Sequence, residues 1–438
     1  MVLHYTPHQS APRTTTFVAE ILDLDYQGRG VAKVQGKTWF IENALPQEKV
    51  EVRIVDEKRH YGHGISCKIL TPHPARQSAK CAYYAQCGGC QSQHIPIDMQ
   101  RQAKQQQALF QRLQQLQPQA TFMPMIVAAP WHYRRRVRLS VRFHPKSKQL
   151  AMGLRQRNTQ QIVNLQHCDV LEIPLSQLLP KLHLLFSTWS LPKNLGHVEL
   201  VHADNGIAML LRHTGNLAQT DRTLLTHFAQ QENLMLFVQD DQQITQLHGE
   251  APYYILRDGT KLQFDIRDFI QVNAVVNQKM IDTALEWLEL TSNDNVLDLF
   301  CGMGNFTLPI SRQVNQVVGI EGVAEMVEKA KRNAEQNQCD NVQFYQANLD
   351  QPFVQQHWAS QHFNKILLDP PRTGAAFALH ALCELGAEKI LYVSCNPATL
   401  VRDTAILLQF NYRLKKVAMI DMFPNTGHLE SISLFEKE

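Results

Sequence analysis

Hydrophobic and polar positions follow three successive patterns along the chain. Residues 17–72 hold five short strand-like runs separated by turn residues, which predicts a small closed or nearly closed β-barrel. Residues 73–262 mix helical and strand patterns and indicate an α+β domain, while residues 1–16 are typical of a flexible leader. From residue 263 to 438, buried strand-like runs alternate with helical ones, and this predicts a doubly wound α/β sheet. Its first five strands are expected at residues 295–300, 316–321, 342–348, 365–369 and 390–394.

The last two strands, near residues 414–422 and 431–436, are too close in sequence for a helical crossover, so we expect them to pair antiparallel. A further helix is expected at residues 97–117, between two prolines.

Composition restricts the class of protein further. The chain has 438 residues, of which 19% are charged and 44% hydrophobic, and its net charge is +3. No apolar run approaches the ~18 residues that a membrane helix needs, and residues 1–16 lack the apolar core of a signal peptide. We therefore expect a cytoplasmic protein with no membrane partner, acting as a monomer. In that compartment cysteines serve as metal ligands or catalysts more often than as disulfides.

Three cysteines lie within ten residues, at Cys81, Cys87 and Cys90, with two glycines inside the closer pair. Cys168 is the best candidate for a fourth ligand. Four thiolates suit either tetrahedral zinc or a 4Fe-4S cluster, and their spacing alone does not separate the two.

A cationic strand follows at residues 133–143. Apolar residues alternate there with basic ones, so one face of the strand is apolar and the other cationic. Guanidinium groups donate bidentately to phosphates, which predicts RNA binding; a solubilising sheet face is the alternative. The candidate RNA-binding residues are Arg134, Arg135, Arg136, Arg138 and Arg142.

The loop after the first strand of the α/β sheet carries Gly302 and Gly304 but no third glycine at the dinucleotide spacing. The two glycines permit a ligand to approach the backbone closely, and Glu321 ends the next strand where a carboxylate accepts hydrogen bonds from ribose hydroxyls. Together they favour S-adenosylmethionine over NAD. Asp369, in Asp-Pro-Pro-Arg, ends the fourth strand, where the transferred methyl group is expected. The absence of an aromatic residue after the prolines disfavours methylation of an exocyclic amine.

Cys395 directly follows the fifth strand, at the sheet edge where open α/β sheets bind ligands. A core cysteine is the alternative interpretation. A thiolate that adds to carbon 6 of uracil makes carbon 5 nucleophilic enough to accept a methyl group, and a base then removes the carbon-5 proton. Glu430 begins the final strand and is the candidate base. We expect the site to lower the pKa of the thiol. A non-catalytic RNA-binding factor would need neither residue.

The motifs around Asp298–Phe306, Leu368–Arg372, Val393–Pro397 and His428–Glu430 together resemble the RNA 5-methyluridine methyltransferase family, and residues 12–72 resemble a TRAM domain. The resemblance implies Cys395 as nucleophile and Glu430 as base. It further implies a 4Fe-4S cluster on the four cysteines and a helix 97–117 packed on the catalytic domain. S-adenosylmethionine would contact Gln271, Phe300, Asn305, Glu321, Asn348 and Asp369.

The barrel and the cysteines together favour members that act on 23S ribosomal RNA, free or in an assembling large subunit. The resemblance implies that the transfer-RNA enzyme of this family lacks both features.

Overall fold

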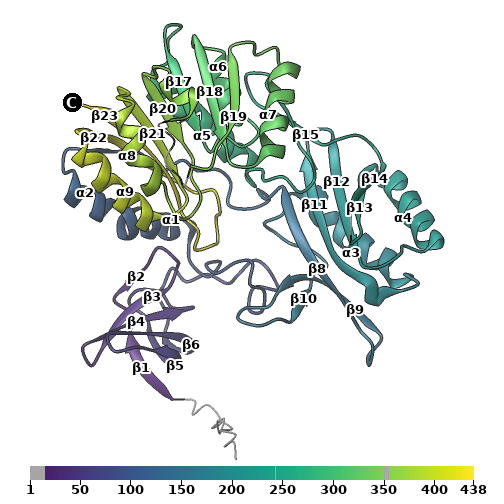
Figure 1. The fold of residues 1–438 in the computed structure, drawn as a ribbon. Helices are drawn as coiled ribbons and strands as arrows, with labels where there is room; N and C mark the ends of the chain where they lie inside the picture. Colours follow the sequence, from purple (N-terminus) through teal and green to yellow (C-terminus); the bar gives the residue numbers. More distant parts are fainter. Residues whose placement is uncertain (1–14, 242, 350, 352, 354) are drawn as a thin grey trace, which may run out of the picture.

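The computed structural model describes residues 15–241, 243–349, 351, 353 and 355–438. The predicted leader lies outside the described residues except for its last two. Figure 1 shows the amino-terminal barrel (purple) standing below two larger sheet regions, the central one (teal) and the carboxy-terminal one (green to yellow).

The barrel is a six-stranded sheet in the order β1-β5-β6-β4-β3-β2, around a core that includes Ile41 and Val52. The sheet has six strands where five runs were predicted, because residues 16–24 form two short strands. The strands are β1 (Thr16–Glu20), β2 (Asp23–Leu24), β3 (Gly30–Val34), β4 (Lys37–Glu42), β5 (Lys49–Glu57) and β6 (Tyr61–Thr71).

The central region is a seven-stranded sheet in the order β10-β9-β8-β11-β12-β13-β14. Its strands are β8 (Arg136–His144), β9 (Gln149–Arg155), β10 (Ile162–Asn164), β11 (Leu195–Ala203), β12 (Gly206–His213), β13 (Leu234–Gln239) and β14 (Ile244–His248). Helices α3 (Ile173–Ser187) and α4 (Gln219–Gln231) accompany it, with the short η2 (Pro192–Asn194). β12 and β13 are parallel, because α4 crosses between them, and the other strand pairs of this sheet are antiparallel.

The carboxy-terminal region is an eight-stranded sheet in the order β19-β18-β17-β20-β21-β23-β22-β7, and the prediction of a doubly wound sheet is confirmed. Its strands are β17 (Asn295–Leu299), β18 (Gln316–Glu321), β19 (Val342–Gln346), β20 (Lys365–Leu368), β21 (Lys389–Ser394), β22 (Tyr412–Ile420), β23 (Glu430–Lys437) and β7 (Thr121–Phe122). The first five are parallel, and β23 runs antiparallel to both β21 and β22, as predicted.

Helices cover both faces of this sheet (Figure 1). They are α5 (Ala274–Leu288), α6 (Thr307–Ser311), α7 (Ala324–Gln336), α8 (Ala376–Glu384) and α9 (Pro397–Gln409), with the short η3 (His357–Ser360). A two-stranded ribbon, β15 (Tyr253–Ile255) and β16 (Lys261–Gln263), precedes α5.

One helical segment from early in the chain packs on this late region. It consists of α1 (Ile97–Gln105), a π-helical turn η1 (Gln106–Phe110) and α2 (Gln111–Leu116), and it lies beside α9 in Figure 1. Leu109 and Leu113 are fully buried in the same core as the sheet, and β7 pairs with β22 directly after the helix. The segment therefore belongs in space to the carboxy-terminal sheet. Among the described residues, no helix is both long and apolar enough to cross a membrane.

Candidate active site and cysteine cavity

Cys395 lies at the carboxyl edge of the large sheet, directly after β21. The next residue, Asn396, caps α9: its side-chain oxygen accepts a hydrogen bond from the Ala398 amide at 3.1 Å. The Asn396 side-chain nitrogen also donates to the carbonyl of Arg372 at 3.0 Å. The cap thus fixes the backbone beside the thiol and ties it to the Asp-Pro-Pro-Arg loop.

The two neighbouring strands bring carboxyl groups to the same edge. β20 ends one residue before Asp369, and β23 begins at Glu430 beside the end of β21, where Ser394 pairs with Ser431. Glu430 is 9% exposed, and its Oε2 has no hydrogen-bond partner within the described structure. Cys395, Asp369 and Glu430 therefore meet although they come from three separate stretches of sequence.

Burial dominates the electrostatics of these three groups. It raises the pKa of Glu430 to about 8, with a smaller contribution from Asp369, and it raises the pKa of Asp369 to about 7. The pKa of Cys395 is raised as well, first by burial and then by Glu430 and Asp369, and the Arg372 guanidinium only partly offsets this. The prediction that the site lowers the pKa of the thiol is therefore wrong: two carboxyl groups and burial outweigh one cation.

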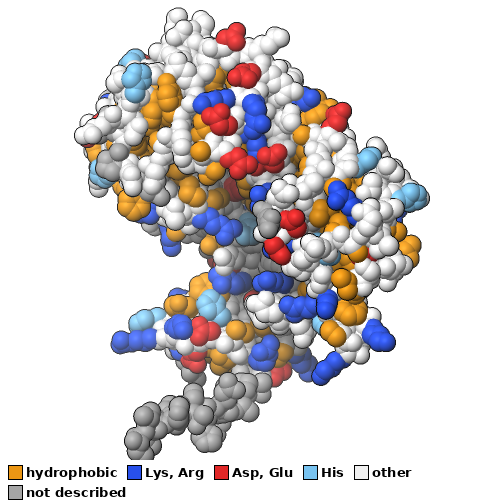
Figure 2. All heavy atoms as spheres, turned by 45° about the vertical axis from the view of Figure 1, so that its right-hand side comes forward, with side chains coloured by type: hydrophobic (Ala, Val, Ile, Leu, Met, Phe, Trp, Pro, Cys, Tyr) orange, Lys and Arg blue, Asp and Glu red, His pale blue; other side chains and the backbone are white. Residues whose placement is uncertain are grey.

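The thiol opens on a cavity of about 530 Å³ where the three regions of the molecule meet. Figure 2 shows Lys and Arg side chains gathered around the hollow between the barrel and the rest of the molecule. Sequence reasoning missed Arg29 and Arg157 as lining residues and named His428 only as the start of the motif that ends at Glu430. The only signal for Arg29 was its place between two glycines. The lining is Tyr26, Gln27, Gly28, Arg29, Glu42, Asn43, Gln91, Arg157, Arg372, Cys395, Asn396, Pro397, Gly427, His428 and Leu429.

The loop after β17 has the backbone that the glycines predict. Phe300, Gly302 and Gly304 have φ of 64°, 55° and 102°, in the left-handed region that favours glycine. A side chain added at Gly302 would meet nothing within 4 Å, so open space borders the backbone there. Glu321, at the end of β18, accepts hydrogen bonds from the Gly302 and Val323 amides at 3.2 and 3.0 Å, which orients its carboxylate beside that space. The geometry fits a nucleoside ligand.

The other predicted cofactor contacts lie in this loop and in two further segments of the chain. Asn305 exchanges two side-chain hydrogen bonds with Asn277, at 3.0 and 3.1 Å, and accepts a third from the Tyr254 hydroxyl at 3.0 Å. Gln271 precedes α5 and is half-buried, and Asn348 is exposed after β19. Sequence reasoning missed Tyr254 and Asn277, because neither lies in a recognisable motif.

The five candidate RNA-binding arginines have different environments. Arg138 and Arg142 are exposed on β8. Arg136 forms an ion pair with Glu199 of β11 at 3.0 Å, and Arg134 lines the cysteine cavity described below.

Arg135 is 3% exposed, so its assignment to the RNA surface is wrong. Its Nε donates to the Gln271 carbonyl at 2.8 Å, and its guanidinium lies 4.6 Å from the centre of the Tyr254 ring.

Cys81, Cys87, Cys90 and Cys168 line one cavity of about 120 Å³. Burial raises the pKa of all four thiols, that of Cys90 to about 12, and the sulfurs raise one another's pKa further. The tight turn depends on glycine, since a side chain at Gly88 would stand 2.9 Å from the Arg155 carbonyl. Within the described residues, no group of three or more His, Cys, Asp or Glu side chains is arranged to hold a metal ion.

The turn is also tied to the larger cavity. Arg157 donates to the carbonyls of Cys87 and Cys90 at 3.1 and 2.6 Å, and its guanidinium stacks 4.6 Å from the Tyr84 ring. Because Arg157 lines the cavity that contains Cys395, one side chain contacts both the cysteine turn and the candidate active site.

Two family models match the chain: tRNA (Uracil-5-)-methyltransferase over residues 98–438, and TRAM domain over residues 13–66. The chain is 99% identical to 23S rRNA (uracil(1939)-C(5))-methyltransferase RlmD of Pasteurella multocida. The match covers the full length of both chains. It is 63% identical to the RlmD of Haemophilus influenzae strain Rd, over 99% of both chains.

The fold is similar to that of the Pyrococcus abyssi tRNA (uracil-54, C5)-methyltransferase, solved with S-adenosyl-L-homocysteine. The TM-score is 0.73, and the match covers 96% of this chain and 100% of the other. Sequence identity is 20%, so this comparison supports the fold alone.

Proposed function

The chain belongs to the tRNA (Uracil-5-)-methyltransferase family, and we propose that it methylates carbon 5 of uridine 1939 in 23S ribosomal RNA. It is an RNA methyltransferase that uses S-adenosylmethionine. The full-length relatives support this substrate, because their names specify that nucleotide. The amino-terminal TRAM domain agrees with an RNA substrate.

One structural observation carries the proposal: Cys395, Glu430 and Asp369 meet at the sheet edge, beside a cavity bordered by three arginines. A pure RNA-binding protein has no use for a buried carboxyl group whose pKa is raised to about 8. A base of that pKa suits proton removal near neutral pH.

The proposed reaction is covalent. The Cys395 thiolate adds to carbon 6 of uracil, and the carbon 5–carbon 6 double bond becomes an enolate that attacks the methyl group. Bound S-adenosylmethionine supplies that methyl group: its bond from sulfur to the methyl carbon breaks, and S-adenosylhomocysteine is left. Glu430 then takes the proton from carbon 5, the double bond reforms, and the bond from carbon 6 to sulfur breaks to release the thiolate.

Asp369 would face the sulfonium centre, and Gln271, Phe300, Asn305, Glu321 and Asn348 would hold the nucleoside and methionine parts, with Gly302 and Gly304 leaving room for them. The open space at Gly302 supports this assignment.

Two substitutions test the covalent mechanism, on an RNA fragment containing the target uridine, with transfer RNA as a control substrate. Cys395→Ala is expected to abolish methyl transfer while leaving RNA binding intact. Glu430→Gln is expected to form a protein–RNA adduct that survives denaturing electrophoresis. Turnover by Cys395→Ala would refute the nucleophile, and the lack of any adduct with Glu430→Gln would refute the base.

For the four cysteines we propose a 4Fe-4S cluster. A single zinc ion draws four sulfurs to within about 3.8 Å of one another, whereas a cubane separates them more widely. The four thiols line one cavity, which supports a group held by all four of them. Iron analysis and visible absorption of anaerobically purified protein test this, with Cys168→Ala expected to lose both. One bound zinc per chain would refute it.

The remaining assignments are proposals of the same kind. Arg138 and Arg142 would contact RNA phosphates, and Arg134 and Arg136 would do so only if they leave their present partners.

Ribosomal RNA is modified in the cytoplasm, on free RNA or on an assembling subunit, so we propose that location for this protein. We also propose that the enzyme is monomeric. We retain 17–72, 73–262 and 263–438 as proposed domain boundaries.

A further inference from the structure

Residues 421–429 connect β22 to β23, and so lead directly into Glu430. Three of them, Gly427, His428 and Leu429, line the cavity that contains Cys395. The position of this connection, here called the β22–β23 loop, therefore determines where the carboxyl group and one cavity wall lie.

The start of the loop is held by charge from helix α1. The Asp421 carboxylate is completely buried and accepts from Lys104 at 2.8 Å and from Arg101 at 3.0 Å. Lys104, itself almost completely buried, donates also to the Phe423 carbonyl at 3.2 Å. A buried carboxylate with two cationic partners resists displacement, because moving it away would leave charges unpaired in a low dielectric.

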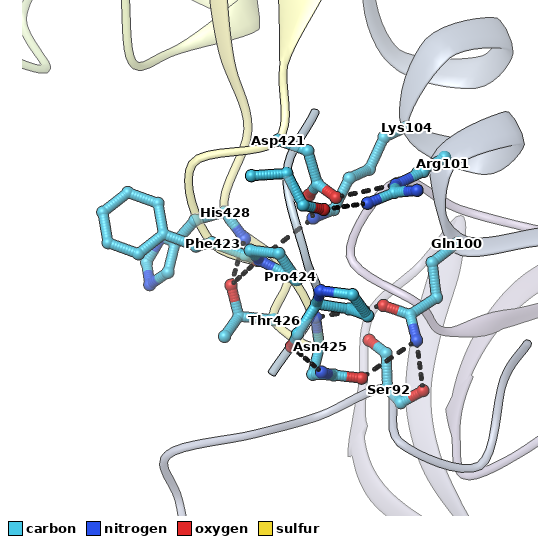
Figure 3. A network of polar contacts seen from close by, with 12 residues as sticks. Ser92, Gln100, Arg101, Lys104, Asp421, Phe423, Pro424, Asn425, Thr426 and His428 are labelled. Carbon is cyan, nitrogen blue, oxygen red and sulfur yellow. Dashed lines mark hydrogen bonds and ion pairs between the residues drawn. The ribbon is translucent and has the colours of Figure 1, made fainter. Parts of the chain in front are cut away.

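The apex of the loop is held by amide groups. Asn425 has φ of 64°, a left-handed conformation that asparagine tolerates. Its backbone N–H donates to Gln100 Oε1 at 3.1 Å, and Gln100 Nε2 donates to Asn425 Oδ1 at 3.2 Å. Gln100 is 4% exposed, and the same nitrogen reaches the Ser92 carbonyl at 2.9 Å. Figure 3 shows these contacts converging on the loop from α1 and from Ser92.

Other segments close the remaining sides. The Gln91 and Ser92 amides donate to the Asn425 carbonyl at 2.9 and 3.2 Å, directly after the cysteine turn. The Tyr133 hydroxyl donates to the Pro424 carbonyl at 3.0 Å. By contrast, Glu430 Oε2 has no hydrogen-bond partner among the described residues, so the carboxyl group depends on its backbone for orientation.

We propose that Gln100 and Lys104 are positioning residues for Glu430, holding the β22–β23 loop so that the carboxyl group meets the carbon-5 proton of the methylated intermediate. This explains why a helix from residues 97–105 packs on a region that begins more than 150 residues later. The inference rests on the proposed function, because it concerns the final proton removal in that reaction.

The test compares two substitutions on one helix. Gln100→Leu removes both amide contacts to Asn425, and Gln102→Leu makes the same chemical change at an exposed position. Lys104→Gln is a second variant that keeps a donor toward Asp421. Misplacing a catalytic group by about 1 Å reduces rates up to about 100-fold. We expect kcat of Gln100→Leu and Lys104→Gln to fall about tenfold or more, with kcat/KM for the RNA fragment changed less than about twofold, because the slowed step follows methyl transfer.

The decisive measurement is the covalent protein–RNA adduct on a denaturing gel. If proton removal is slowed, the adduct accumulates in Gln100→Leu and Lys104→Gln, as it does in Glu430→Gln. Gln102→Leu is expected to form no more adduct than the unchanged protein. Binding of S-adenosylmethionine is expected to be unchanged in all of these variants. Adduct in Glu430→Gln but in neither positioning variant would overturn the inference alone. Loss of cofactor binding in both positioning variants would also overturn the inference, because it would show that the substitutions disturb the catalytic region as a whole. Absence of adduct even in Glu430→Gln would instead overturn the base assignment, and the inference with it.

Discussion

Replacing Glu430 by glutamine is expected to stabilise the folded protein, and to do so increasingly as pH rises. Burial raises the pKa of this carboxyl group from 4.5 to about 8, so the folded chain binds the proton more tightly than the unfolded chain does. The stability associated with that proton is fully present below pH 4.5 and is lost as pH rises toward 8. Glutamine cannot ionise, so the variant escapes the loss.

The magnitude follows from the two pKa values. Each pH unit between them is worth about 1.4 kcal/mol, which gives a maximum of about 5 kcal/mol above pH 8. The difference is about 3 kcal/mol at pH 7 and less than about 1 kcal/mol at pH 5. For a unit of 150–250 residues, 3 kcal/mol corresponds to a shift of about 6–12 °C in Tm.

The assay is thermal unfolding of both proteins from pH 5 to pH 8.5. Packing of the new amide adds an offset that is independent of pH, so the slope of the difference with pH is the informative quantity. Glu384→Gln, at an exposed position on α8, is the matched control for the change from glutamate to glutamine. A Tm difference for Glu430→Gln that stays constant across this range would refute the reasoning.

Two further predictions concern arginines. Arg135→Met is expected to weaken S-adenosylmethionine binding about tenfold by calorimetry, because Arg135 supports the Gln271 backbone and the Tyr254 ring; an unchanged Kd would contradict this. Arg142→Ser is expected to reduce the slope of log K for RNA against log salt by about 0.7–0.9, the value for one lost phosphate contact. An unchanged slope would remove Arg142 from the RNA surface.

The edge of the large sheet was predictable from sequence because parallel strands end together. Each strand is a local apolar run, and the polar residue that ends it is visible in the same run. Asp369 directly follows β20, and Cys395 directly follows β21. Glu430 could be placed at the same edge once the last strand was predicted to be antiparallel. Local pattern was sufficient wherever the site residue terminates a strand.

Contacts between distant segments were not predictable in this way. Alternation along β8 separates apolar from basic positions, but Arg135 precedes the strand and is covered by the segment at Gln271, which lies 136 residues later in the chain. Tyr254 reaches Asn305 over a separation of 51 residues. Neither contact can be predicted from a single sequence, because the type of a residue does not determine which distant segment will pack on it.

The raised pKa values of Glu430 and Cys395 impose an order on the proposed reaction. An ionised Glu430 beside Cys395 disfavours the thiolate, since the two negative charges repel. With its pKa near 8, Glu430 is mostly neutral at pH 7, so that repulsion is absent when the thiol adds to uracil. The same carboxyl group must be ionised when it takes the carbon-5 proton. Glu430 therefore has to release its proton to solvent in the adjoining cavity between addition and elimination, after the thiolate charge has been consumed in the bond to carbon 6.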